Sequence, residues 1–369
     1  MKNITFKVPF NRHGHLRELI TLLQFVIGYV ARQFWGMVVM PNLTIAVTTW
    51  QHARRYREDI EYVLQRQGLP KFELVMTAYL TDNTDPKNIE EGFKNGTWKA
   101  VKLYPHGATT NSDKGVTKIK NVYSVFAVME ELGIPLLIHP ETDSSRPEIP
   151  FVDKERVYTD ETLTEIHRKF PKLIISVEHV TTKEAAQFVE EAPDNVTATV
   201  TPQHILYNTD AIYHGGVAPW KPGAYVENVC QPILKPQADV DYLRQAIMFG
   251  PKKHKFGAGD DNAWHIDIHK HEPCSRCGVA HVASVEAYAM AFDLMGMFKT
   301  DEGILVFENF MSVNNLGIFG LKPSAETITL HYQEQTVPEF IDANGNKIRP
   351  FKAGQKIPWT LEKRILTTV

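Results

Sequence analysis

The sequence predicts an α/β fold in which eight parallel strands form a (β/α)8 TIM barrel. Short runs rich in apolar and β-branched residues recur along the first 260 residues, and segments with helical spacing separate several of them. This alternation is typical of parallel strands joined by crossover helices. An open doubly wound sheet is disfavoured, because no G-x-G-x-x-G motif follows the first run. The expected strands cover residues 4–8, 36–40, 73–77, 99–104, 135–139, 173–179, 196–201 and 255–260.

Three of the segments between these runs have the pattern of amphipathic helices. Residues 49–68 place apolar side chains at helical spacing and end in a glycine, and residues 122–133 do the same. Residues 181–192 open with threonines, which are favoured as N-terminal helix caps. We therefore expect a helix in each segment.

The apolar stretch 19–40 requires a separate interpretation because of its length. Gln24, Arg32 and Gln33 interrupt it, so that no uninterrupted apolar run of about 20 residues remains. We expect a buried helix followed by a strand and no membrane span.

The pattern changes after residue 261. A long loop leads into an apolar helix expected at residues 285–298, and strand-like pieces follow from about residue 320. We treat residues 1–369 as a single barrel domain with a C-terminal extension after about residue 300.

Composition excludes several classes of function. The chain has 369 residues and a formal net charge of -3, and no basic stripe points to nucleic acid. Three cysteines are too few for a disulfide framework, and the first residues lack a secretory pattern. We expect a cytoplasmic protein that binds neither nucleic acid nor membrane.

Polar side chains stand at or just after the ends of six expected strands. Active sites of such barrels lie at the C-terminal ends of the strands, so these side chains should meet. A lone histidine at a strand end is usually structural, but a converging set is harder to explain in that way. The set contains His13, His15, Asn42, Lys102, His139, His179, Asp260 and Asp261.

The histidines and aspartates in this set suggest a metal site. Imidazole and carboxylate together suit zinc and similar divalent ions. His13 and His15 alternate along an extended chain, so both imidazoles point to the same side. Five such ligands exceed the four of one tetrahedral zinc, which suggests two cations that need an anionic bridge.

Lys102 lies between apolar residues in an expected strand, where a charged amine is costly. A deprotonated lysine is nucleophilic, and addition of CO2 would turn it into an anionic carbamate able to bridge two cations. Alternatively, Lys102 pairs with a buried acid such as Asp261 or Glu178. The residues alone leave both possibilities open.

Eight motifs resemble the dihydroorotase family of the amidohydrolase superfamily, in particular its free-standing bacterial type. They occur in the family's order between residue 13 and about residue 290. The combinations KLYP-x-x-ATTNS and EH-x-TTK are especially specific. The motifs are HGHLRE (13–18), MPNLTIAVTT (40–49), KLYPHGATTNSDKGV (102–116), LLIHPET (136–142), EHVTTKEAA (178–186), TVTPQHILYN (199–208), QPILKP (231–236) and GDDNAWH (259–265).

The resemblance implies an amidohydrolase-type barrel with two Zn2+ ions per chain. His13, His15 and Asp261 would hold one ion, and His139 and His179 the other. Lys102, carboxylated on its amine, would bridge the two ions together with a hydroxide. Asp261 would also be the catalytic acid and base.

The family reaction is the reversible cyclisation of N-carbamoyl-L-aspartate to L-dihydroorotate and water in pyrimidine biosynthesis. By resemblance, Arg17, Asn42 and His265 would bind the substrate carboxylate. Thr109 and Thr110 lie in the segment that matches the family's substrate-covering loop.

The chain departs from the family pattern at several positions near these motifs. Gly14 stands between the two histidines, where a bulkier residue is usual, and Asp260 occupies a threonine or serine position. Trp264 replaces a proline, and residues 220–228 form an insertion before Cys230. None of these departures removes an implied metal ligand.

Two other functions compete with this interpretation. A hydantoinase-like or allantoinase-like cyclic-amide hydrolase would share the metal ligands but not the combination of Arg17, Asn42 and His265. A catalytically inactive relative that binds a carbamoyltransferase would be expected to have lost ligands. The resemblance also makes a homodimer possible, with the small-molecule substrate as the other partner.

A second zinc site is a weaker candidate. Cys274 and Cys277 form a C-x-x-C motif with His269, His271 and His281 nearby.

Overall fold

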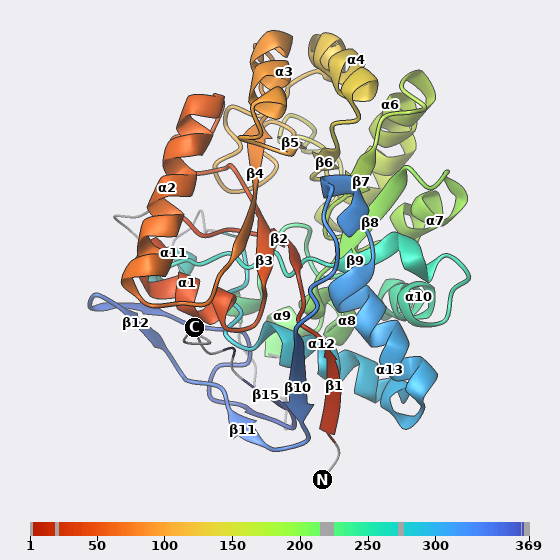
Figure 1. The fold of residues 1–369 in the computed structure, drawn as a ribbon. Coiled ribbons are helices and arrows are strands. Elements are labelled where there is room, and N and C mark those ends of the chain that lie inside the picture. Colours follow the sequence, from red (N-terminus) through yellow and green to blue (C-terminus); the bar gives the residue numbers. More distant parts are fainter. Residues whose placement is uncertain (1–2, 19–21, 215–224, 272–276, 363, 365–369) are drawn as a thin grey trace.

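The computed structural model describes residues 3–18, 22–214, 225–271, 277–362 and 364, and it contains the predicted barrel. Eight strands form one sheet in the order of the sequence, and every neighbouring pair from β2 to β9 is parallel (Figure 1). The strands are β2 (Asn11–Gly14), β3 (Gly36–Val39), β4 (Glu73–Tyr79), β5 (Ala100–Leu103), β6 (Leu136–Ile138), β7 (Ile175–Val177), β8 (Val196–Val200) and β9 (Phe256–Ala258).

Helices surround the barrel sheet (Figure 1). The three amphipathic segments form α2 (Trp50–Arg66), α4 (Tyr123–Leu132) and α7 (Lys183–Glu191), as predicted. Thr49 and Thr182 cap the first and third of them through their side chains. The remaining helices are α1 (Gln24–Ala31), α3 (Pro86–Lys94), α5 (Lys154–Tyr158), α6 (Thr164–Lys169), α8 (Pro202–Leu206), α9 (Ala211–His214), α10 (Gln237–Met248), α11 (Asp267–Lys270), α12 (Ser284–Leu294) and α13 (Asp301–Glu308).

The prediction of the first barrel strand was wrong. Residues 4–8 overlap β1 (Asn3–Lys7), which lies outside the barrel and pairs antiparallel with β10 (Thr327–His331). Its alternation of exposed and buried side chains is typical of a strand with one face in solvent. The true first barrel strand is β2, whose four residues are all buried although their sequence, NRHG, is polar. A search for hydrophobic patterns does not detect such a strand, because its buried side chains are polar.

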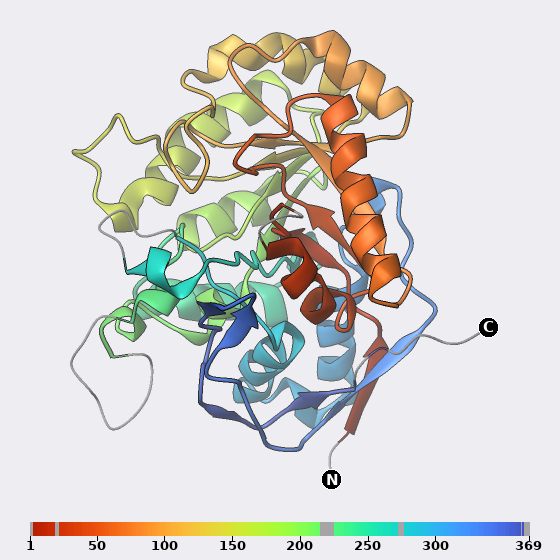
Figure 2. The same cartoon turned by 90° about the vertical axis from the view of Figure 1, so that its left-hand side faces the viewer.

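The C-terminal part packs beside the barrel and returns to β1. β10 lies between β1 and β15 (Thr360–Leu361) in a three-stranded sheet, which Figure 2 shows at the end of the molecule away from α3 and α4. Two small antiparallel pairs complete this region: β11 (Gln335–Thr336) with β14 (Lys356–Ile357), and β12 (Ile341–Ala343) with β13 (Asn346–Ile348). The division into one barrel domain and an extension after about residue 300 stays a prediction.

Apolar side chains close the bottom of the barrel. Val38, Val75, Ala100 and Leu137 belong to one buried cluster that includes Phe319. Within the described ranges, no helix is both long and apolar enough to cross a membrane.

Because β1 joins the N-terminus to the C-terminal sheet, its buried face should be important for stability. Phe6 is 1% exposed, and its ring meets Phe307 edge-on at 5.1 Å. We expect Phe6→Ala to lower the free energy of unfolding by about 3–5 kcal/mol, because it leaves a cavity. Thr5→Ala, on the exposed face of the same strand, should cost less than about 1 kcal/mol. Urea unfolding measures both, and equal losses would contradict this role of the buried face.

Candidate metal centre and substrate pocket

The alternation of side chains along the barrel strands places the candidate ligands above the apolar floor. Ala100 and Leu137 are part of the floor cluster. Lys102 and His139 follow two residues later, so their side chains point to the same interior face, one layer higher. This geometry explains why a lysine and a histidine occupy the ends of otherwise apolar strands.

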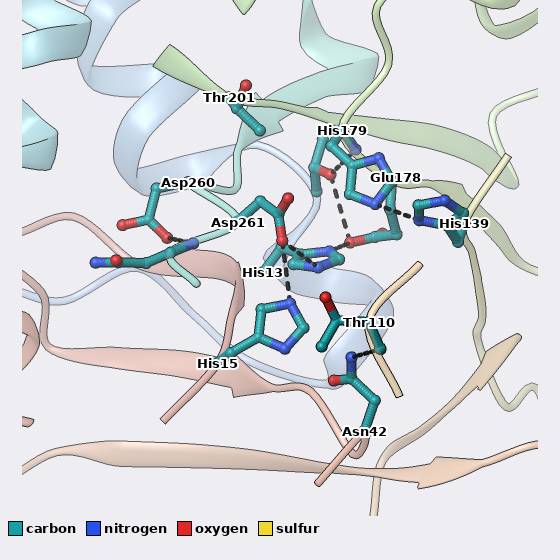
Figure 3. Close-up of polar contacts among 12 residues, drawn as sticks. His13, His15, Asn42, Thr110, His139, Glu178, His179, Thr201, Asp260 and Asp261 are labelled. Atoms are coloured by element: carbon teal, nitrogen blue, oxygen red, sulfur yellow. Dashed lines mark hydrogen bonds and ion pairs between the residues drawn. The ribbon is translucent and has the colours of Figure 1, made fainter. Parts of the chain in front are cut away.

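His13, His15 and Asp261 form a compact cluster. Asp261 Oδ1 lies 3.0 Å from His15 Nε2 and 3.3 Å from His13 Nε2 (Figure 3). Within the described part of the chain, this is the one group of three or more histidine, cysteine or acidic side chains whose ligand atoms all lie within 4.8 Å. Three ligand atoms at this spacing can hold one divalent ion.

His139 and His179 form a second pair beside this cluster. His139 Nδ1 faces His179 Nε2 at 3.2 Å, and the His13 and His179 rings lie 5.0 Å apart. The other nitrogen of His139 bonds to Glu141 Oε2 at 3.0 Å, which orients its ring. Two imidazole nitrogens at this distance can share one proton or bind one cation.

Lys102 is fully buried, and its Nζ has no hydrogen-bond partner among the described residues. Burial lowers the pKa of Lys102 to about 8, although the charges of Glu178 and Asp261 act in the opposite direction. More of the amine is therefore neutral near pH 7 than for an ordinary lysine. Ion pairing with either acid is not observed, because both carboxylates bond to histidines.

Glu178 supports His13 in a way that sequence analysis missed. Its Oε2 accepts a hydrogen bond from His13 Nδ1 at 2.5 Å, and its Oε1 accepts one from Ser176 Oγ. A carboxylate behind an imidazole fixes the ring and strengthens it as a metal ligand. The only signal in the sequence is the position of this acid next to His179, and the residues alone predict it only as a possible partner of Lys102.

Burial keeps most of these imidazoles in their neutral form. It lowers the pKa of His15 to about 4 and also lowers the pKa values of His139 and His179. For His13, burial acts in the same direction, but hydrogen bonds to Asp261 and Glu178 outweigh it and the pKa is raised. Bonds from His13 and His15 likewise outweigh the burial of Asp261 and lower its pKa, so that it is a carboxylate at neutral pH.

Three site residues adopt left-handed backbone conformations without being glycine. The φ angles are 62° at Arg17, 41° at His179 and 48° at Asp261. Such conformations cost about 1–3 kcal/mol each and are common at functional sites. Sequence analysis did not predict them, because it associates positive φ with glycine.

Of the candidate residues for the substrate carboxylate, Arg17 and Asn42 line the pocket of the candidate metal ligands, whereas His265 contacts Arg17 and lines a neighbouring pocket. Arg17 Nη2 and His265 Nε2 are 3.0 Å apart, and Arg17 Nε donates to the carbonyl of Trp264. Asn42 is also buried and lines the same pocket as Arg17 and the metal-cluster residues. The pocket wall further includes Tyr104, whose buried hydroxyl has no partner among the described residues.

The segment with Thr109 and Thr110 forms part of the wall of this pocket. Thr110 Oγ1 donates to the carbonyl of Cys277 at 3.3 Å, and its own carbonyl accepts from Asn42 Nδ2 at 3.0 Å (Figure 3). Asn111 Nδ2 donates back to the carbonyl of Asn42. Thr109 lines the pocket as well.

Some expected features do not join this site. Asp260 points away from the cluster and bonds to the side chain of Asn11 (Figure 3). Cys274 and most of the insertion at 220–228 lie outside the described residues. His281 bonds to Gln203 at 2.9 Å.

Comparison with known proteins decides the family. The chain is 37% identical over 361 residues to a dihydroorotase from Erythrobacter litoralis, covering 98% of this chain and 99% of that protein. It is 38% identical over 363 residues to one from Laribacter hongkongensis, with the same coverage. The chain belongs to the dihydroorotase family. No family model matches the sequence.

Solved dihydroorotase structures agree with this assignment. The Saccharomyces cerevisiae dihydroorotase in complex with 5-fluoroorotic acid superposes with a TM-score of 0.85 at 25% identity, over 99% of this chain and 100% of that one. The Campylobacter jejuni dihydroorotase gives a TM-score of 0.81 at 27% identity, over 98% of both chains. An L-hydantoinase from Arthrobacter aurescens shares the fold at 12% identity, with a TM-score of 0.74 over 97% of this chain and 84% of that one. These matches confirm the predicted barrel type.

A hydrogen bond from Tyr79 holds the segment 106–115, so removing it should loosen that segment. Tyr79 Oη donates to the carbonyl of Asn111 at 3.1 Å. Because Tyr79→Phe removes about 0.5–1.5 kcal/mol of hydrogen bonding, amide exchange over residues 106–115 should become about 2- to 10-fold faster. Tyr158→Phe is the control, since its buried hydroxyl has no partner among the described residues. Amide exchange is measured by mass spectrometry. Equal exchange rates over residues 106–115 in the two variants would show that the Tyr79 hydrogen bond does not restrain the segment.

Proposed function

We propose that this member of the dihydroorotase family catalyses the reversible cyclisation of N-carbamoyl-L-aspartate to L-dihydroorotate and water in pyrimidine biosynthesis. The observation that carries the proposal is the convergence of four imidazoles, the Asp261 carboxylate and the Lys102 amine at the mouth of the barrel. Arg17 lines the same pocket as these groups, and His265, 3.0 Å from Arg17, would complete a site for a carboxylate. Full-length similarity to dihydroorotases supports the same activity.

The site residues fit two zinc ions per chain. His13, His15 and Asp261 would hold one ion, and His139 and His179 the other. Lys102 would lie between them as a carbamate: its neutral Nζ adds to the carbon of CO2 and releases one proton. The orphaned, buried Nζ supports this role, because a buried polar atom without a partner usually has one in the functional state.

The remaining groups bind substrate and move the proton. When bound, the ions supply the Lewis acidity that polarises the ring carbonyl and makes water acidic. The Asp261 carboxylate accepts the proton of the attacking water and transfers it to the ring nitrogen as the amide bond breaks. The Arg17 guanidinium, with His265 and Asn42, binds the substrate carboxylate. The segment with Thr109 and Thr110 covers the substrate and excludes water.

The alternatives make different predictions for substrate choice. Purified protein should turn over dihydroorotate far faster than hydantoin or allantoin, because those substrates lack the carboxylate that Arg17 would bind. The measurement is the kcat/KM for each substrate after loading with zinc and bicarbonate. A preference for hydantoin or allantoin would refute the proposal. Less than one zinc per chain together with no turnover would favour the inactive carbamoyltransferase-binding protein.

Replacing Lys102 tests the bridge. Lys102→Ala should abolish turnover and remove at least one zinc per chain, because the anionic link between the ions is lost. Short carboxylic acids should restore part of both by occupying the vacated space. Lys255→Ala is the control: Lys255 is also buried, and its pKa is also lowered to about 8, but it donates hydrogen bonds to carbonyls just after the C-terminal end of α7. Unchanged zinc content in Lys102→Ala, measured by elemental analysis, would exclude the bridging role.

The homodimer and the cytoplasmic location stay predictions from the sequence, as does the absence of nucleic-acid and membrane partners.

A further inference from the structure

The barrel is closed differently at one seam than at its other strand junctions. Parallel ladders join each neighbouring pair from β2 to β9, with an irregular register between β2 and β3, whereas the described residues of β9 and β2 form no ladder with each other. Gly14, the last residue of β2, and Asn262, beyond the end of β9, make one isolated parallel bridge. The metal-cluster residues His13, His15 and Asp261 lie at this same seam.

Two buried side chains add to the two backbone hydrogen bonds that cross this seam, from Asp261 N to the carbonyl of His13 and from His15 N to the carbonyl of Asn262. Asn11 Nδ2 donates to Asp260 Oδ1 at 2.6 Å, and Asn11 Oδ1 accepts the backbone N–H groups of His13 and Asp260 at 3.2 and 3.1 Å. Asp260 Oδ1 also accepts the N–H of Asn262 at 3.1 Å. Asn11 and Asp260 are both fully buried, so water does not compete for these bonds.

These bonds hold the backbone on both sides of Asp261. Asp260 is bonded to Asn11, and Asn262 is bonded to Asp260 and to the backbone of His281. Between them Asp261 has a φ of 48°, a left-handed conformation that persists only where its surroundings enforce it. Asp261 N donates to the carbonyl of His13 at 3.0 Å. The hydrogen bonds of Asn11 and Asp260 therefore hold the backbones of His13 and Asp261 next to each other.

Gly14 belongs to the same unit. A Cβ at this position would lie 2.5 Å from Met37 Cε, 2.9 Å from Asn11 Nδ2 and 3.5 Å from Asp260 Oδ1. Any side chain at position 14 would therefore push on the Asn11–Asp260 pair. Gly14 and Asp260, two of the departures from the family pattern, therefore lie next to the same Asn11 side chain.

We propose that Asn11, Gly14 and Asp260 form a positioning brace, which sets the geometry of His13 and Asp261 for metal binding. The inference rests on the proposed metal site and adds three residues that do not touch the ion. The brace acts through hydrogen bonds and not through charge, because a single oxygen of Asp260 accepts both of its bonds. An amide oxygen in the same place can accept the same two bonds.

This difference gives the test its central pair of variants. Asp260→Ala removes the acceptor, whereas Asp260→Asn keeps an acceptor and removes only the charge. Asn11→Ala and Gly14→Ala break the brace from the other strand. Asn314→Ala is the matched control: Asn314 donates to the carbonyl of Phe256 at the opposite end of β9, far from the metal cluster along that strand.

The readout is metal binding and not turnover. Zinc affinity is measured by competition with a chromogenic chelator, and the visible spectrum of the Co2+-loaded protein reports ligand geometry. Asp260→Ala, Asn11→Ala and Gly14→Ala should bind the more weakly held ion about 10- to 100-fold less tightly, with an altered Co2+ spectrum. Asp260→Asn and Asn314→Ala should stay within about threefold of the wild type, even where Asn314→Ala lowers the melting temperature.

Three results would overturn the brace. In the first, Asp260→Ala and Asn11→Ala keep the zinc affinity and the Co2+ spectrum of the wild type but melt at a lower temperature. The Asn11–Asp260 hydrogen bond would then contribute to stability only. The second is equal loss in Asp260→Asn and Asp260→Ala, which would make charge the cause. The third is a loss of zinc affinity in Asn314→Ala as well, which would mean that any destabilisation of β9 weakens metal binding. A wild-type protein that binds no zinc would instead refute the proposed metal site, so the two failures are distinguishable.

Discussion

The site depends on one buried carboxylate that two imidazoles share. Asp261 lies between His13 and His15, and its Oδ1 is within 3.3 Å of a nitrogen of each. Removing a carboxylate from water costs several kcal/mol, and only close, well-oriented partners offset that cost. The resulting demand for exact placement explains why so much polar structure surrounds this residue: Glu178 behind His13, and Asn11 with Asp260 beside the seam.

A polar layer above an apolar floor is the general arrangement of this barrel. Side chains such as Ala100 and Leu137 fill the interior below, and Lys102 and His139 rise from the same strands above them. The segment around Thr110 forms part of the pocket wall and bonds to the carbonyl of Cys277. Burial in this pocket lowers the pKa of the Lys102 amine and of several imidazoles, which raises their neutral fraction. The surrounding apolar core must offset the cost of burying these polar groups.

The left-handed residues show how the fold and the site constrain each other. Arg17, His179 and Asp261 each follow a barrel strand or its extension, where the chain must turn sharply and still direct a side chain inward. Glycine would relieve the strain but would remove the functional group. Gly14 is the opposite case, since the space beside it is already taken by Asn11 and Met37. The residue type is therefore constrained by the functional group at the three left-handed positions and by the neighbouring side chains at Gly14.

The sequence by itself determined the barrel and most of the residues that converge in it. Apolar runs and helical spacing are local patterns, and seven of the eight expected runs overlap barrel strands. The remaining run, residues 4–8, is a strand but not a barrel strand, because an alternating pattern indicates a strand without indicating which sheet it joins. The true first barrel strand, β2, is polar and has no hydrophobic pattern to detect. The distances within the metal cluster, the support of His13 by Glu178 and the seam between β9 and β2 were decided only by the tertiary structure. These features join residues about 165 to 250 positions apart, and no local pattern records which distant side chains the closed barrel brings within hydrogen-bonding distance.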